Sequence, residues 1–406
     1  MRVLFVAPYV PSRVRVRPYE LIRALAGLGH RVHLVMLRPP EDRWAPDAAL
    51  RDACERVDEF PLSRGRTLLN ASLALAGPDP LQAAYAHHAG ATRRLTALAA
   101  SGHFDVLHVE HLRGVKLVSG VVGIPVVFDA VDSIAHLFEQ TARSAARWQQ
   151  RLAARLDLRR TERFEARAPY LFGRMLVTSP VDRDAFVRRA GPAAAGRIEV
   201  LPNGVDWEYF VPGTGIRQPA TVIFTGKMSY HANEAAALQL AQRVMPAVWA
   251  RRPDARLIIA GKDPSAGIRA LAADARVDVT GYVDDLRPFL ARACVAVSPM
   301  VYGAGIQNKV LEAMASGVPV VTSPQACASL TASPGQDLLV GATPEETARQ
   351  VLRVFEEAGL ARRLGEAGRS YVRRCHDWTS IGRRLTEIYD EAGAEMGRLP
   401  AEQAAR

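Results

Sequence analysis

Lysine, cysteine and long apolar runs are all scarce in this chain, and each scarcity is informative. The four cysteines are widely spaced and form no C-x-x-C, which argues against a disulfide framework and against a thiolate metal site. No apolar run reaches the length of about 18–20 residues that a membrane span needs. The first residues lack the small-residue cleavage site of a signal peptide. We therefore expect a cytoplasmic location. Only four of the 52 basic residues are lysines: Lys116, Lys227, Lys262 and Lys309.

Size and composition predict a two-domain globular protein. A chain of 406 residues is right for two domains of roughly 150–200 residues each. Hydrophobic residues make up 49% and charged residues 23%, which is typical of a folded chain. The net charge of +10 permits an anionic partner without identifying one.

Short β-branched apolar runs alternate with helical patterns along the chain. Strands at Arg2–Ala7 and Arg31–Leu37 enclose a helical pattern at Pro18–Leu28, and this β-α-β unit predicts a parallel sheet. A proline- and glycine-rich break at Val211–Ala220 is typical of a linker, and the alternation restarts after it. Further strands are expected at Phe104–Val109, Pro125–Phe128, Arg174–Thr178, Ile198–Leu201, Thr221–Phe224, Arg256–Ala260, Val277–Thr280, Cys294–Ser298 and Val318–Thr322. The pattern predicts an α/β protein with two similar domains and a ligand cleft at the carboxyl ends of their strands.

The segment Ser298–Val321 carries the clearest chemistry. A strand ends at Ser298, a loop with two glycines follows, and a helix is expected from near Gln307 to Ser316. A helix N-terminus after such a loop favours a phosphate or pyrophosphate. Lys309 lies in the first helical turn, and Glu312, one turn on, is placed to accept hydrogen bonds from ribose hydroxyls. The alternative is a common glycine loop followed by a plain surface Lys–Glu pair.

This segment resembles a known family. Its pattern GxGxxxxxLEAMASGVPVV is similar to the nucleotide-binding segment of retaining glycosyltransferases with two Rossmann-like domains, the GT-B fold of the family 4 type. The segments VLPNGVDWEYF, FTGKM and VTGYV follow the family's order, and the resemblance covers roughly residues 1–390. FTGKMSYHAN, VDDLRPFLA and GIQNKVLEAMA further resemble sugar transferases of exosortase/PEP-CTERM exopolysaccharide loci.

The resemblance implies an organisation and an activity. Residues 1–205 would form an acceptor-side domain, residues 206–376 a nucleotide-sugar-binding domain, and residues 377–406 a C-terminal helix and tail, with the helix packing back on the first domain. The implied reaction moves a sugar from a nucleotide-diphosphate donor to a glycan or lipid-linked acceptor in exopolysaccharide or glycoconjugate synthesis. The family implies retention of anomeric configuration, no metal, and no cofactor besides the nucleotide sugar as co-substrate.

The family's donor site can be carried over by position. Glu312 matches the second glutamate of the E-x7-E motif, which binds the donor ribose, but the first position is Ala304. Lys227 stands where the family has a pyrophosphate-clamping arginine, and Asn233 stands where it has a lysine, so we expect Lys309 to restore that charge. A solvated loop residue is the alternative for Lys227. The resemblance further implies donor binding by Gly303, Gly305, Ile306, Gln307, Asn308, Gly226, Tyr282, Val283 and Asn203.

The first domain departs further from the family. In place of a glycine-rich loop it has VPSRVRVRP, in which Arg13, Arg15 and Arg17 are expected to form a fork that binds an acceptor phosphate or the donor. A solvated charged loop is the alternative. Where relatives carry a His-Asp pair, this chain has Val131-Asp132, so the aspartate is kept and the histidine is replaced by valine. Asp129 and Asp132 are expected in the cleft, where they either orient sugar hydroxyls in catalysis or cap the helix after Ser133.

Two apparent metal patterns are rejected. Asp182-Arg183-Asp184 fits the letters of a D-x-D motif, but after Ser179-Pro180 it indicates the acidic first turn of a helix. His108 and Glu110 share one face of a strand while His111 lies on the other, so they do not make a metal site. Glu110 is expected to line the cleft on the acceptor side together with Arg15 and Arg17.

Arginine recurs at every fourth position from Arg143 to Arg167. On a single helix each step of four residues drifts by about 40°, so the row winds slowly around one side. Trp148, Leu152 and Leu156 would form an apolar strip beside it. One hypothesis is an ordinary solvated helix, and the other is contact with anionic lipid at the inner face of the cytoplasmic membrane. A nucleic-acid partner is not expected, because no aromatic platform or reader motif accompanies the charge.

Three functions remain open from the sequence. The leading hypothesis is the glycosyltransferase just described. A nucleotide-sugar epimerase or hydrolase would use the same scaffold but needs its own acid and base. A non-catalytic sugar-nucleotide binder is suggested by Ala304. Dependence of donor turnover on an acceptor separates the three.

Overall fold

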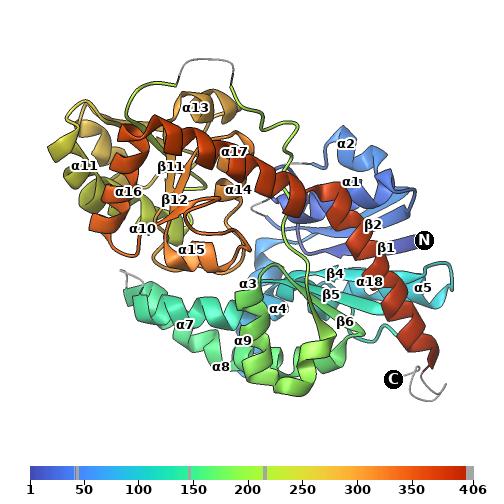
Figure 1. Cartoon of the computed structure of the whole chain (residues 1–406). Coiled ribbons are helices and arrows are strands. Elements are labelled where there is room, and N and C mark those ends of the chain that lie inside the picture. The colour runs from blue at the N-terminus through green and yellow to red at the C-terminus, as the bar shows by residue number, and fades with distance from the viewer. Residues whose placement is uncertain (41, 43–44, 145–147, 214–216, 399–406) are drawn as a thin grey trace. The chain divides into compact units, whose positions relative to one another are not determined.

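The computed structural model describes residues 1–40, 42, 45–144, 148–213 and 217–398, and it divides into two compact units (Figure 1). The first unit comprises Met1–Glu139, Ala153–Asn203 and the segment from Trp378 onward. The second comprises Gln140–Leu152 and Gly204–Asp377. By this division the chain enters the second unit briefly at Gln140–Leu152, enters it again just after Asn203, and returns to the first unit just after Asp377.

The first unit is built on a parallel sheet of seven strands in the order β3-β2-β1-β4-β5-β6-β7. Its strands are β1 (Arg2–Ala7), β2 (Arg31–Arg38), β3 (Arg56–Pro61), β4 (Val106–Glu110), β5 (Val126–Val131), β6 (Arg174–Val177) and β7 (Ile198–Val200). Helices connect them: α1 (Val16–Gly27), α2 (Ala48–Asp52), α3 (Arg64–Leu75), α4 (Leu81–Tyr85), α5 (Ala89–Ala100), α6 (His111–Gly114), α7 (Ile134–Ser144), α8 (Trp148–Leu171) and α9 (Pro180–Ala190), with short 3₁₀ turns at Val115–Leu117 and Pro192–Arg197.

Both faces of this sheet are buried, which explains why its strands are apolar throughout. Val3 and Phe5 of β1 belong to a core with α1, and Leu4 and Val6 belong to a second core on the other face. The last helix, α18 (Trp378–Arg398), contributes Leu385 and other buried residues to the α1 side, and it lies along α1 (Figure 1). The C-terminal helix therefore packs on the first unit, as predicted.

The second unit repeats the plan with six parallel strands in the order β10-β9-β8-β11-β12-β13. They are β8 (Thr221–Thr225), β9 (Arg256–Ala260), β10 (Val277–Gly281), β11 (Val295–Ser298), β12 (Val320–Thr322) and β13 (Leu339–Val340). The helices are α10 (His231–Gln239), α11 (Met245–Arg251), α12 (Ala266–Ala270), α13 (Arg287–Arg292), α14 (Asn308–Ala315), α15 (Pro324–Ala328), α16 (Pro344–Glu356) and α17 (Ala358–Cys375). A π-helical turn at Leu240–Val244 and a 3₁₀ turn at Leu271–Ala273 complete the unit.

The expected strands are confirmed, with ends shifted by at most three residues. Two strands were missed, and both lie at sheet edges. β3 (RVDEFP) is largely exposed and polar, and β13 is only two residues long, so neither has the apolar run of a central strand. The arginine row of 143–167 is not on one helix as expected. α7 ends at Ser144 and α8 begins at Trp148, while Arg147 lies outside the described residues.

Nothing in the described helices has both the length and the apolar character of a bilayer-spanning segment.

Close packing between α14 and α17 gives the first prediction. A Cβ added at Gly365 of α17 would lie 2.4 Å from the carbonyl oxygen of Gly317, which is backbone and cannot swing away. A Cβ at Gly359, in the first turn of the same helix, would meet only the flexible Arg363 guanidinium at 3.5 Å. We expect Gly365→Ala to lower the free energy of unfolding of the second unit by about 1–3 kcal/mol through overpacking.

Urea denaturation of both variants checks this expectation. Gly359→Ala is the control and should be neutral or slightly stabilising, because alanine has the higher helix propensity. Equal stability of the two variants would show that the α14–α17 packing can relax around an added methyl group.

Candidate functional site

In each unit the strand order reverses next to its first strand. The reversal lies between β1 and β4 in the first unit and between β8 and β11 in the second. In doubly wound sheets, ligands bind at the carboxyl ends of the strands at such a switch point. The residues that follow these four strands are therefore the candidates, and most of the site residues predicted from the sequence fall among them.

In the second unit, Lys309 lies at this point. It sits in the first turn of α14, which begins after the N-cap Gln307, close to the predicted start, and ends at the C-cap Ser316, one residue before the glycine that the sequence suggested as the cap. Its Nζ donates to Asn233 Oδ1 at 2.7 Å and to Gln307 Oε1 at 3.1 Å, and it approaches Met300 Sδ at 3.7 Å. The ammonium also lies 5.2 Å from the ring centroid of Phe224, within cation–π range.

The groups that contact the Lys309 ammonium are uncharged. Among the described residues, no carboxylate oxygen lies within ion-pair distance of its Nζ. Burial lowers the pKa of Lys309 to about 8, and the charge of Glu312 opposes this shift. Burial likewise raises the pKa of Glu312 to about 7, against the attraction of Lys309. A cation surrounded by uncharged acceptors at a helix N-terminus is electrostatically suited to an anion.

The loop after β8 packs directly against this lysine. Gly226 has φ of +149°, and a Cβ there would lie 2.8 Å from Asn233 Nδ2 and 3.3 Å from Lys309 Cε. Asn233 in turn donates from Nδ2 to the carbonyl oxygen of Lys227 at 2.9 Å. Asn233 thus links the β8 loop to Lys309 by hydrogen bonds from both ends of its amide. The ammonium of Lys309 thus lies beside Asn233, the position at which the resemblance implies a lysine.

The other residues expected to bind the donor differ in how exposed they are. The Lys227 side chain is exposed, whereas Ile306 is buried in the core under α14. Tyr282 is 65% exposed on the loop after β10, and Val283 beside it is half-buried. Near α14, Gly305 takes a left-handed conformation with φ of +66°. Gly303 and Asn308 are half-buried in the same turn region.

Four side chains near this site were not predicted individually. Phe224 and Met300 surround the Lys309 ammonium, and the ring of Tyr302 stacks on His231 with its hydroxyl 3.0 Å from Nδ1. These residues lie inside the segments FTGKM, SPMVYG and SYHAN, so the motifs marked the place. Which member of each motif makes these contacts depends on loop conformation, which the pattern does not encode.

In the first unit, Arg17 is the centre of the corresponding cluster. It is 4% exposed, and its Nε donates to Asp129 Oδ2 at 2.7 Å. Its Nη1 donates to Asn203 Oδ1 at 3.0 Å and to the carbonyl oxygens of Leu201 and Pro202. Asn203, expected to bind the donor, is therefore grouped with the acceptor-side residues of the first unit.

The expected arginine fork does not form. Arg17 lies in α1, not in a loop, and it is committed to Asp129. Arg15 pairs with Asp42 and stacks on the Tyr9 ring at 4.3 Å, while Arg13 is exposed. The alternating pattern placed all three on one loop, but α1 begins at Val16 and turns Arg17 into the core.

Glu110 is buried rather than lining an open surface. It is 1% exposed at the end of β4, and Tyr9 donates its hydroxyl proton to Glu110 Oε1 at 2.9 Å. Burial, reinforced by the negative charge of Asp129, raises the pKa of Glu110 to about 8. Burial also lowers the pKa of neighbouring His108 to about 4, and its Nδ1 lies 2.9 Å from the hydroxyl of Tyr389 on α18.

Asp132 follows a strained turn after β5. Val131 has φ of +67°, which is unusual for a β-branched residue, and such strain is concentrated at functional sites. Asp132 accepts from Thr178 Oγ1 at 3.1 Å, and burial together with the negative charge of Asp182 raises its pKa.

The helix after Ser133 is capped by other carboxylates than the sequence suggested. Asp182 accepts from the Ser133 amide at 2.9 Å, and Glu165 accepts from the Ala135 amide at 2.9 Å. Neither Asp129 nor Asp132 has this role. Asp182 also lies in the first turn of α9 behind the N-cap Ser179, as predicted.

Within the described ranges, no group of three or more histidine, cysteine, aspartate or glutamate side chains is arranged to hold a metal ion.

Comparison with protein families covers both units. Residues 14–209 match the model of Glycosyltransferase Family 4, and residues 219–357 match that of Glycosyl transferases group 1. The chain belongs to the group 1 glycosyltransferases. The first match covers most of the first unit and the second match lies within the second unit, so the assignment rests on both parts of the chain.

Characterised relatives add detail. Over 210 residues, 47% of this chain, the sequence is 30% identical to a GDP-mannose-dependent monoacylated alpha-(1-6)-phosphatidylinositol monomannoside mannosyltransferase from Corynebacterium glutamicum, of which the match spans 55%. It is 27% identical over 252 residues, 58% of this chain and 62% of the relative, to a GDP-mannose:cellobiosyl-diphosphopolyprenol alpha-mannosyltransferase from Xanthomonas campestris. The matched regions thus cover less than two thirds of either relative.

Solved structures share the two-domain GT-B fold. A sucrose-phosphate synthase from Thermosynechococcus elongatus matches with a TM-score of 0.70 at 17% identity, over 97% of this chain and all of that one. HepE from Anabaena, solved with UDP and glucose, matches with a TM-score of 0.64 at 16% identity, over 96% of this chain and 99% of that one. At these identities the likeness establishes the fold only.

The buried Arg17–Asp129 pair gives a second prediction. Arg17→Met leaves the Asp129 carboxylate buried without its partner, so we expect the free energy of unfolding of the first unit to fall by about 3–5 kcal/mol. Arg13→Met removes an equally long but exposed guanidinium and should change stability by no more than about 0.5 kcal/mol. Urea denaturation measures both.

A double variant tests the stated cause. Adding Asp129→Asn to Arg17→Met removes the stranded charge and should recover part of the loss. If Arg17→Met is no less stable than Arg13→Met, the buried ion pair makes no net contribution to the free energy of unfolding.

Proposed function

We propose that this protein transfers a sugar from a nucleoside-diphosphate donor to a glycan or lipid-linked acceptor, with retention of anomeric configuration and without a metal. The second unit binds the donor diphosphate, and the carboxyl end of the first unit's sheet serves the acceptor. Family membership supports the reaction class, and the site geometry supports the placement of the diphosphate.

One observation carries this proposal: the ammonium of Lys309 contacts Asn233, Gln307 and Met300 and lies near the Phe224 ring, and all four of these groups are uncharged. Glycosyl transfer breaks the bond between the anomeric carbon and the diphosphate oxygen, so negative charge grows on the leaving group. A preorganised cation at a helix N-terminus stabilises that charge in the transition state. A lysine already neutralised by a carboxylate would do so far less effectively.

Two further residues support donor binding. Glu312 lies one helical turn beyond Lys309 and, when ionised, is a good acceptor for ribose hydroxyls. Lys227 is exposed on the loop after β8, the loop that Asn233 links to Lys309, and it is the second cation proposed for the diphosphate. Ala304 stands where the family pattern has its first glutamate, so contacts to the transferred sugar must come from other groups.

On the acceptor side we propose that Asp129, Asp132 and Glu110 orient hydroxyl groups. Asp129 is ion-paired with Arg17, whereas burial raises the pKa of Glu110 to about 8. A carboxylic acid that keeps its proton at neutral pH can donate a hydrogen bond, and an ionised neighbour accepts one. The first unit therefore offers both roles at one sheet edge.

The names of the relatives suggest which substrates to try first. Two of them use GDP-mannose, and their acceptors are a phosphatidylinositol mannoside and a diphosphopolyprenol glycan. We propose GDP-mannose as the first donor and a lipid-linked glycan as the first acceptor to test. Participation in exopolysaccharide assembly, and membership of the exosortase-associated subgroup, stay predictions from the sequence motifs alone.

Mass spectrometry of reactions with UDP-, GDP- and ADP-sugars against lipid-linked and free glycan acceptors tests the function. A transferase releases nucleoside diphosphate and extends the acceptor only when acceptor is present. Sugar isomerisation without acceptor would instead indicate an epimerase, free sugar a hydrolase, and tight binding without turnover a non-catalytic binder.

Substitutions at the proposed donor site should separate binding from catalysis. We expect Lys309→Ala to lower kcat about 10²–10³-fold, because a cation that stabilises the leaving group is lost. Glu312→Ala should weaken nucleotide binding about 10–100-fold, because hydrogen bonds to a charged group are lost. Steady-state kinetics and calorimetric titration with the nucleoside diphosphate measure the two effects.

Matched controls lie outside the site. Lys116→Ala removes a lysine of the first unit that pairs with Asp79, and Glu356→Ala removes an exposed glutamate on α16. Both controls should keep wild-type rates and affinities. Wild-type behaviour of Lys309→Ala and Glu312→Ala would overturn the site assignment.

The pKa values of Lys309 and Glu312 predict a narrow pH optimum for nucleotide binding. Below about pH 7 Glu312 is protonated and loses acceptor strength, and above about pH 8 Lys309 loses its charge. Affinity for a nucleoside diphosphate should therefore rise toward pH 7 and fall above pH 8. Isothermal titration calorimetry between pH 5.5 and 9.5, a range spanning both groups by about 1.5 units, checks this.

One substitution tests each limb of this pH profile. Lys309→Arg keeps a positive charge throughout the range and should flatten the alkaline limb alone, whereas Glu312→Gln should flatten the acid limb alone. An alkaline limb that persists unchanged in Lys309→Arg would assign it to another group.

A further inference from the structure

Helix α3 of the first unit turns apolar side chains to the solvent. Leu68 and Leu73 are 70% and 68% exposed, and Leu69 and Leu75 are also more than half exposed. The helix packs through its opposite side, where Thr67 and Ala74 are buried. At about 100° per residue, Leu68, Leu69 and Leu73 lie roughly 100–160° around the helix from Thr67 and Ala74, and Leu75 lies about 80–100° from them, on the flank of this face. Large apolar side chains on a water-facing helix usually mark an interaction surface.

The helix is fixed in this orientation. Ser63 caps its N-terminus by accepting from the Arg66 amide, and Asn70 Nδ2 donates to the carbonyl oxygen of His87 at 2.8 Å. At the other end, Arg160 of α8 donates from Nη2 to the Leu75 carbonyl oxygen at 2.5 Å and from Nε to that of Gly77 at 3.0 Å. The leucine face is therefore presented by a helix anchored along its length.

The charge around this face has one sign. Helix α3 contains no acidic residue, and its two arginines, Arg64 and Arg66, are both exposed. In angle around the helix, Arg64 lies about 40° from Leu68, and Arg66 lies about 20° from Leu73. Both arginines thus share the side of the leucines, one turn or more toward the N-terminus. Asp79, the next acid after the helix, is paired with Lys116.

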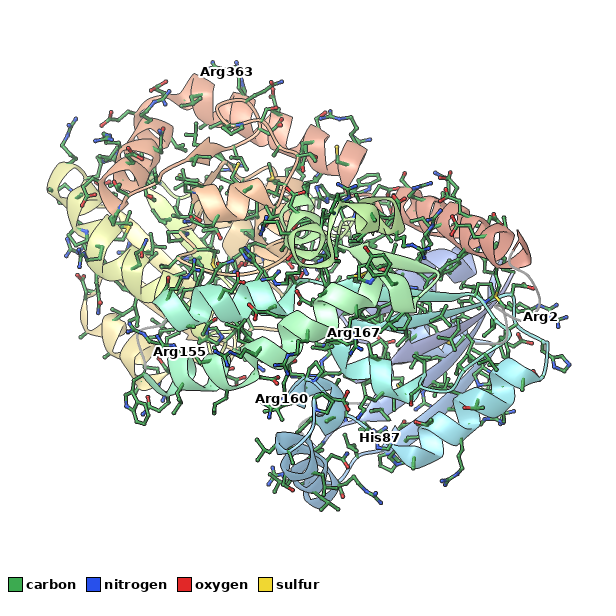
Figure 2. All side chains as sticks on the ribbon, turned by 90° about the horizontal axis from the view of Figure 1, so that it is seen from below. Arg2, His87, Arg155, Arg160, Arg167 and Arg363 are labelled. Carbon is green, nitrogen blue, oxygen red and sulfur yellow. The ribbon has the colours of Figure 1, made fainter. Side chains whose placement is uncertain are left out.

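Helix α8 extends the same surface. Leu156, 58% exposed, precedes Arg160 by one turn, and Arg160 is the residue that joins α8 to the end of α3. Arg155, which precedes Leu156, and Arg159, which precedes Arg160, are also exposed. Figure 2 labels Arg155 and Arg160 along α8. We call the four leucines of α3 together with Arg64, Arg66, Leu156 and Arg159 the α3 face.

We propose that the α3 face docks on an anionic lipid bilayer, with its leucines inserted at the boundary of headgroups and acyl chains and its arginines on the lipid phosphates. Interfacial helices combine an apolar face with lysine or arginine at its margins, and they lie in the plane of the membrane. The long arginine side chains reach the phosphates while their aliphatic parts stay with the leucines.

A second copy of the chain is the less suitable occupant. A twofold interface would bring the α3 face against itself, so Arg64 and Arg66 of both copies would meet without a carboxylate on α3 to compensate. An anionic lipid surface supplies the complementary charge. The arginine row of 143–167 is not by itself such a surface, because the drift of about 40° per step carries Arg151 and Arg167 to nearly opposite sides of α8.

Sedimentation of the full-length protein with lipid vesicles, without donor or acceptor, tests the proposal independently of the proposed function. We expect binding to vesicles of phosphatidylcholine with phosphatidylglycerol and much weaker binding to phosphatidylcholine alone. The double variant Leu68→Gln/Leu73→Gln should lower the partition coefficient at least tenfold. Arg64→Gln/Arg66→Gln should lower it about tenfold at low salt and less at high salt.

Leu171→Gln is the matched control, because Leu171 is a 62% exposed leucine at the far end of α8. It should bind vesicles within twofold of wild type, and the melting temperatures of all variants should stay close to that of wild type. Three results would overturn the proposal: no binding of the wild type to anionic vesicles, equal binding by Leu68→Gln/Leu73→Gln, or a wild-type dimer that this variant dissociates.

Discussion

Each unit depends on a parallel sheet whose strand order reverses beside its first strand. The reversal separates the loops that leave two neighbouring strands and opens a place at the sheet edge that the fold itself does not fill. In this chain the loops after β8 and β11 bring Gly226, Asn233 and Lys309 together, and the chain after β1 and β4 brings Tyr9 and Glu110 together. The topology of the two sheets therefore fixes where the candidate functional residues lie, whatever the identity of their side chains.

The two switch points have opposite electrostatic character. In the second unit a cation is surrounded by neutral acceptors and keeps an unbalanced charge. In the first unit Arg17 is paired with Asp129, while burial pushes the pKa values of Glu110 and Asp132 upward. A site for an anionic group and a site rich in carboxyl groups are the complementary requirements of moving a sugar from a diphosphate to a hydroxyl group.

The sequence predicted the fold and much of the donor site because both depend on local patterns. Apolar runs marked the central strands, and the glycine loop before α14 marked the position of Lys309. Edge strands β3 and β13 were missed because a half-exposed strand has no such run. The burial of Arg17 was not predicted because it depends on the ion pair with Asp129, which is 112 residues away in the chain. The exposed leucines of α3 gave no signal either, since the sequence does not show which side of an apolar helix meets the core.

Helix α18 has a consequence for how the protein is made. Its residues complete the α1 side of the first unit's core, and Tyr389 reaches the buried His108. On the ribosome, this helix emerges only after the whole second unit has been synthesised. Until then the first unit lacks α18, and part of its apolar core stays uncovered. The second unit can already fold before α18 is synthesised. The second unit is therefore completed before the first, although most of the first unit precedes it in the sequence.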